Sequence, residues 1–158
     1  MTKTRNDLPE GVRSKATDLL NARLADLIDL ALSAKHAHWN VKGPGFIALH
    51  ELFDKVADEV QGFVDDVAER VVQMGGTAEG RSRAVAGKTA LPAYPAGAAD
   101  GPAHVDALAS AVAAAAKAVR ADIDRLDEWG DAVGADLLTG VAAGLDKQLW
   151  FLEAHLTE

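Results

Sequence analysis

The stretch "HWNVKGPGFIALHELFD", residues 38–54, contains the break between two long helical segments of the chain. Its "GPG" tripeptide cannot continue a helix, whereas the following "FIALHELF" repeats apolar residues at helical spacing. The same stretch carries His38 and His50, and Asp54 follows His50 by one helical turn. It therefore predicts a helical hairpin with metal-type ligands near its closed end.

Hydrophobic periodicity outside this stretch predicts four long helices. They run from the Asp7–Gly11 region to about His38, from residue 46 to about Met74, from about His104 to Glu128, and from about Asp131 to about Leu156. A short helix is expected between Glu79 and Lys88, inside the long connection 77–103. Four long helices with one long connection between the second and third are typical of an all-α, ferritin-like four-helix bundle. We expect one such domain over residues 10–158, after a short N-terminal tail, 1–9.

Each of the first two helices has an apolar face in this prediction. The stripe on the second contains Phe46, Leu49, Phe53, Val56, Val60, Phe63 and Val67. On the first, a polar face opposite the apolar stripe contains Arg13, Asp18, Asn21, Asp26 and Asp29.

Composition narrows the chemistry that the chain can perform. There is no cysteine among its 158 residues, so a metal would be bound by His and carboxylate ligands, and a cytoplasmic protein is favoured. The formal net charge of −8 argues against a generally basic nucleic-acid surface. No apolar run reaches the roughly 18–20 residues needed to span a bilayer, and the N-terminal residues do not resemble a secretory signal.

The second helix carries two separated ligand pairs on one face. With His50 at zero on a helical wheel, Asp54, Asp65 and Glu69 fall at about 40°, 60° and 100°, away from the apolar stripe. Eleven residues separate Asp54 from Asp65, or about 16 Å of helix. One metal ion with bonds of about 2.0–2.2 Å cannot bridge that distance.

A two-fold axis through the helix near residues 59–60 resolves this difficulty. Such an axis places residue i of one copy opposite residue 119 − i of the other. His50 therefore faces Glu69 of the second copy, and Asp54 faces its Asp65, because the numbers of each pair add to 119. Gly62, near the middle of this face, would let the second helix approach closely. His38, across the turn from His50, adds a second imidazole to each site.

Two histidines and three carboxylates suit Fe(II), Mn(II) or Zn(II). Two alternatives stay open on spacing alone. One is a solvated acidic face with an incidental histidine, because charged i,i+4 patterns are common on helices. The other is a metal-free helical oligomer.

The segments "KHAHWNVKGPGFIALHELFD" and "VDDVAERVVQMGG", with "SKATDLLN", "TALPAYP" and "LDKQLWFLEAHL", closely resemble the Dps family of ferritin-like mini-cages. The resemblance covers nearly the whole chain. It implies a hollow homododecamer, built from two-fold dimers, that oxidises Fe(II), preferentially with hydrogen peroxide, and stores ferric mineral as protection against oxidative stress. Its ferroxidase ligands fall on His38, His50 and Asp54 of one subunit and on Asp65 and Glu69 of the two-fold mate.

The resemblance also assigns roles to residues outside the ligand set. Trp39 matches an electron donor or radical trap, although packing at the end of the first helix explains it equally well. Acidic pores on three-fold axes would draw on the turn between the last two helices, at Asp127, Glu128, Asp131 and Asp136. The alternative for these carboxylates is stabilisation of the last helix dipole. His36 is read as surface or packing, and His104 and His155 receive no role.

DNA binding is the function that the family name suggests and the sequence disfavours. The N-terminal tail offers only Lys3 and Arg5, which Asp7 and Glu10 offset. Since phosphate contacts supply most non-specific affinity for DNA, we expect weak, salt-sensitive binding at best. A nucleoid-associated DNA-compacting protein, with ferroxidase activity secondary, remains the alternative function.

Overall fold

The computed structural model describes residues 1–156 and within that range contains five helices and no strand. The helices are α1 (Glu10–Asn40), α2 (Phe46–Gln73), α3 (Ser82–Lys88), α4 (Gly101–Glu128) and α5 (Ala132–Glu153). The expected all-α bundle with a short extra helix between its second and third long helices is therefore confirmed. None of these helices is both long enough and apolar enough to cross a membrane.

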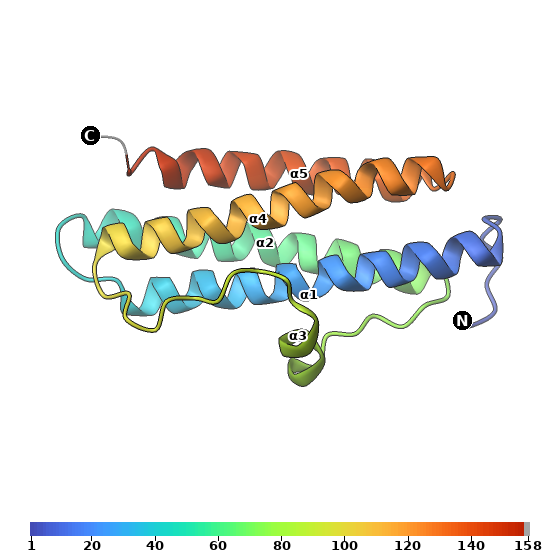
Figure 1. Ribbon diagram of the computed structural model, residues 1–158, viewed down its shortest axis with the longest axis horizontal. Coiled ribbons are helices and arrows are strands. Elements are labelled where there is room, and N and C mark those ends of the chain that lie inside the picture. Colours follow the sequence, from blue (N-terminus) through green and yellow to red (C-terminus); the bar gives the residue numbers. More distant parts are fainter. Residues whose placement is uncertain (157–158) are drawn as a thin grey trace.

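The four long helices form two hairpins that pack side by side (Figure 1). α1 packs most extensively against α2, and α4 against α5. Figure 1 shows α2 and α4 running in the same direction, so the connection between them travels back along the bundle and passes over α1. This crossover is the topology expected of a ferritin-like bundle, and it places the α1–α2 turn and the start of α4 at one end.

The helix boundaries differ from the predicted ones by a few residues, for local reasons. α4 begins at Gly101 rather than about His104 because the Asp100 carboxylate accepts a hydrogen bond from the Ala103 N–H, at 2.9 Å. α5 ends at Glu153 rather than near Leu156. α2 ends where Gly75 takes a φ of +86°, a conformation that glycine adopts without strain.

The core is formed by apolar side chains of all four long helices, of which Phe53, Leu27, Leu108 and Leu145 are fully buried. The prediction that Phe46 belongs to this core is wrong, because its side chain is 41% exposed. It stands at the first position of α2.

The polar face predicted for α1 is not all solvent-exposed. Asn21 and Asp26 are buried because the connection after α2 lies over them. The Asn21 amide donates to the Thr77 carbonyl at 3.1 Å, and its oxygen accepts from the Glu79 N–H at 2.9 Å. Asp26 accepts from the Ala90 N–H at 2.8 Å. These hydrogen bonds hold the connection against α1. They also satisfy backbone groups of the connection that water would otherwise hydrogen-bond.

Candidate metal centre

His38 and His50 face each other across the α1–α2 turn. Their rings stack with centroids 3.7 Å apart and planes inclined by 22°. The Nδ1 of His38 lies 2.7 Å from the His50 carbonyl oxygen, and the Nδ1 of His50 lies 2.8 Å from the His38 carbonyl oxygen. Each histidine is thus held by the backbone of the other.

This reciprocal arrangement fixes which nitrogen of each ring is available. A carbonyl oxygen can only accept, so each Nδ1 carries the proton and donates it. In the neutral rings, Nε2 then keeps its lone pair, which is the state needed to bind a metal ion. A hydrogen bond from the second ring nitrogen to a carbonyl is also what orients metal-bound histidines in proteins. The pair therefore has the chemistry of a prepared ligand set.

Asp54 lies beside this pair, and Lys35 holds it. The Asp54 Oδ1 is 3.8 Å from the His38 Nδ1 and pairs directly with the Lys35 ammonium. The Lys35 hydrogen bond holds the pKa of the Asp54 carboxyl below its usual value, with smaller contributions from His38 and His50. The carboxylate is consequently ionised and available to a cation. Lys35 was not recognised from the sequence, although it lies one helical turn before His38.

Asp65 and Glu69 lie on the same helix as Asp54 but are exposed, several turns away. Within residues 1–156 of a single chain, no three His, Asp or Glu side chains gather closely enough to hold a metal ion. The structure thus places Asp54 near the His38–His50 pair without forming a three-ligand site, and it leaves the other two predicted ligands farther away. The assignment of all five to one centre stays a prediction.

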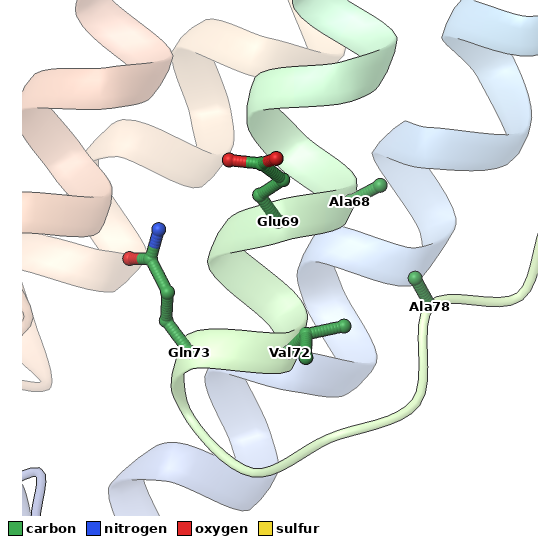
Figure 2. Close-up of a pocket in the computed structure, with 5 residues that line it drawn as sticks. All are labelled: Ala68, Glu69, Val72, Gln73 and Ala78. Atoms are coloured by element: carbon green, nitrogen blue, oxygen red, sulfur yellow. The ribbon is translucent and has the colours of Figure 1, made fainter.

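An apolar groove lies beside Glu69. It is an open hollow of about 410 Å³, lined by Ala68, Glu69, Val72, Gln73 and Ala78. Figure 2 shows Ala68 and Val72 pointing toward Ala78, while the polar ends of Glu69 and Gln73 lie on the other side. Val72, which lines this groove, is 57% exposed.

At the other end of α2, Ile47 is exposed to a similar degree, 60%. The residue numbers of Ile47 and Val72 add to 119, as those of His50 and Glu69 do. A second copy placed about the predicted two-fold axis would therefore bring Ile47 to the groove at Val72 in the same step that brings His50 to Glu69.

The acidic turn between α4 and α5 divides into two kinds of carboxylate. Asp127, Glu128 and Asp136 are exposed, but Asp131 is buried. The Asp131 Oδ1 accepts hydrogen bonds from the Arg70 guanidinium at 2.5 Å and from the Gly134 N–H at 3.0 Å.

The expectation that Asp131 lines an iron-entry pore is therefore corrected. Its carboxylate caps the N-terminus of α5 and pairs with the buried Arg70 guanidinium instead.

Trp39 is 68% exposed, so the packing role considered for it does not occur within one chain. The Lys35 ammonium lies 5.9 Å from the centroid of its ring. Its role as an electron donor stays a prediction.

Comparisons with known proteins agree with this fold. The family model described as the ferritin-like domain matches residues 17–158. The "DNA protection during starvation protein" of Agrobacterium fabrum is 49% identical over 99% of this chain and 96% of its own length. The protein of the same name from Mycolicibacterium smegmatis is 36% identical over 90% of this chain and 78% of its own.

Solved structures extend the comparison. The Dps of Mycobacterium smegmatis in its tetragonal form superposes with a TM-score of 0.94, at 34% identity over all of this chain and 95% of that one. The Dps of Microbacterium arborescens in a high iron form superposes with a TM-score of 0.88. It is 37% identical over 98% of this chain and 99% of that one. The chain belongs to the Dps family of ferritin-like proteins.

Proposed function

We propose that this protein oxidises Fe(II), preferentially with hydrogen peroxide, at centres shared between two-fold-related subunits. The ferric product is stored inside a hollow dodecamer, and the cell is thereby protected from oxidative damage. Iron is the substrate and cargo of this reaction, and Zn(II) or Mn(II) are alternative occupants of the centre.

The observation that carries the proposal is the reciprocal locking of His38 and His50. Two imidazoles whose Nε2 atoms keep their lone pairs, with an ionised Asp54 near the His38 Nδ1, supply three of the five predicted ligands, a mixture that suits Fe(II). These three do not form a metal site within one chain. Asp65 and Glu69 of a second copy would complete it, and the apolar match of Ile47 to the groove at Val72 favours that copy's placement.

Each part of this set has a chemical task. The imidazoles bind Fe(II), and the carboxylates stabilise the higher charge of Fe(III) after oxidation. The Lys35 ammonium pairs with Asp54, so a cation held by this carboxylate would compete with that ion pair. Hydrogen peroxide accepts two electrons, so its complete reduction at the centre releases water and avoids hydroxyl radical.

Exposed carboxylates at the acidic turn would attract iron to the shell. After the correction of Asp131, the proposed entry residues are Asp136, Asp127 and Glu128. A ring of negative charge raises the local concentration of cations.

DNA compaction is the less favoured function. The N-terminal tail is docked on the end of α2, where the Thr2 N–H and hydroxyl both donate to the Gly75 carbonyl, at 2.6 and 3.1 Å. Its two cations, Lys3 and Arg5, are thus carried by a segment attached to the bundle. We expect only weak DNA retention in a gel-shift assay at physiological salt.

The test of the main proposal is Fe(II) titration of metal-free protein with peroxide, following ferric absorbance. We expect fast oxidation with a soluble ferric product, and loss of that phase in the Asp65→Ala/Glu69→Ala variant. Asp66→Ala is the matched control, because Asp66 is also exposed on α2 but lies outside the set. Unchanged kinetics in the double variant would refute the centre.

A further inference from the structure

Tyr94 and His104 form a hydrogen-bonded pair where the connection before α4 meets α1 and α4. Tyr94 belongs to the connection before α4, and His104 lies in the first turn of α4 with no exposed surface. The Tyr94 hydroxyl oxygen is 2.5 Å from the His104 Nδ1. This distance is within hydrogen-bonding range.

The environment fixes the direction of this hydrogen bond. Burial raises the pKa of Tyr94 to about 12, so the phenol keeps its proton. Burial also lowers the pKa of His104, as does the neighbouring His36 to a smaller degree. A neutral His104 therefore accepts the proton of the Tyr94 hydroxyl at Nδ1. Its Nε2, which then carries hydrogen, has no partner among residues 1–156.

The pair contacts both helices that carry the predicted ligands. The Tyr94 ring meets the His36 ring edge-on, with centroids 5.0 Å apart, and His36 precedes His38 by two residues on α1. The imidazole of the pair packs 6.4 Å from the ring of Phe53, the residue before Asp54 on α2. These aromatic contacts thus place Tyr94 against the residue two before His38 on α1, and His104 against the residue before Asp54 on α2.

We propose that Tyr94 donates an electron to the iron centre and that His104 takes the phenolic proton as it leaves. This inference rests on the proposed function. Peroxide needs two electrons, and a centre holding one Fe(II) supplies only one. The balanced step is Fe(II), Tyr94–OH, neutral His104, H₂O₂ and two solvent protons giving Fe(III), the Tyr94 phenoxyl radical, His104–H⁺ and two waters.

The phenol suits this task because its base is already in place. A tyrosine that has lost an electron is a far stronger acid than an imidazolium, so the proton moves to Nδ1 along the existing hydrogen bond.

An open surface hollow beside Tyr94 offers a small reductant a route to its ring. Tyr94 lines an open hollow of about 450 Å³ on the surface between α1 and the connection. The other residues that line it are Leu32, Ser33, His36, Pro95 and Ala96.

The first experiment uses the fact that the chain has a single tyrosine. Protein loaded with one Fe(II) per centre is mixed with peroxide, frozen, and measured by electron paramagnetic resonance. We expect a phenoxyl radical that is absent in Tyr94→Phe, together with more spin-trapped hydroxyl radical in that variant. Ferric iron without a phenoxyl signal, or with a tryptophan radical alone, would overturn the proposal.

The second experiment needs no iron and separates this inference from the proposed function. Metal-free protein is oxidised by flash-generated ruthenium(III) tris-bipyridine, and the appearance of the Tyr94 radical is timed at neutral pH. Loss of the base in His104→Gln should slow it by about 100-fold, the lower end of what a positioned base contributes to proton transfer. Circular dichroism verifies the fold of that variant.

Free tyrosine amide in the same flash experiment is the reference that does not depend on any variant. The wild-type phenol should react faster than the amide. Equal rates would show that His104 is only a packing partner of Tyr94, and the proposal would fail whether or not the iron chemistry is found.

Discussion

Sharing of the centre between subunits predicts a specific result when two inactive variants are mixed. One variant, His50→Ala/Asp54→Asn, loses the ligands at the start of α2. The other, Asp65→Asn/Glu69→Gln, loses those near its end. The two sets are about 16 Å apart along the helix, against metal–ligand bonds of about 2.0–2.2 Å, so one chain cannot use both at one ion.

The expected magnitude follows from the two-fold axis. In a mixed dimer one site receives both damaged halves, and the other receives His50 and Asp54 from one chain with Asp65 and Glu69 from its mate. Random pairing of equal amounts makes about half of the dimers mixed, so about a quarter of all sites are intact.

The assay is the rate of ferric absorbance after Fe(II) and peroxide are added to co-expressed, co-purified subunits. Each variant alone should show almost no fast phase, and the mixture should recover about a quarter of its wild-type amplitude. An Asp66→Asn variant reports the effect of removing an exposed charge from the same helix. No recovery in verified mixed assemblies would refute the shared centre.

Three further predictions concern stability, titration and assembly. Asp131→Ala should lower the free energy of unfolding by about 3–5 kcal/mol in chemical denaturation, because it leaves the Arg70 guanidinium buried without a partner, whereas exposed Asp136→Ala should change it little. The absorbance of phenolate should rise near pH 12 rather than at 10, and stability should fall over that window, because the unfolded chain releases the Tyr94 proton first; titration near 10 would contradict the buried phenol. Gly62→Arg has open space around it within one chain, so it should leave the helical spectrum intact but prevent the two-fold dimer in gel filtration; an unchanged assembly size would remove the axis from this face.

The fold could be predicted from the sequence because its signals are local. Apolar spacing and the "GPG" break give the helices and the turn, and the closeness of His38 to His50 follows from that turn. The hydrogen bonds of the two rings could not be predicted, because the position of a residue on a helix does not determine its side-chain rotamer.

Contacts between distant segments account for what the sequence could not show. Asp131 read as a solvent-facing acid, but its partner Arg70 lies on a different helix, 61 residues earlier. No role was predicted for His104, because its partner Tyr94 lies in the connection before α4. That connection is positioned by hydrogen bonds to α1, such as the one from the Ala90 N–H to Asp26. Asp65 and Glu69 remain predictions because their proposed partners belong to another copy.

The crossed backbone hydrogen bonds of His38 and His50 have a consequence for how a metal ion would be captured. Both imidazoles are immobilised before any ion arrives, so little side-chain entropy remains to be lost when it binds. The same two bonds join the last turn of α1 to the first turns of α2. Replacement of either ring should therefore loosen the hairpin as well as remove a ligand, and the affinity of the centre is coupled to the folding of the loop between them.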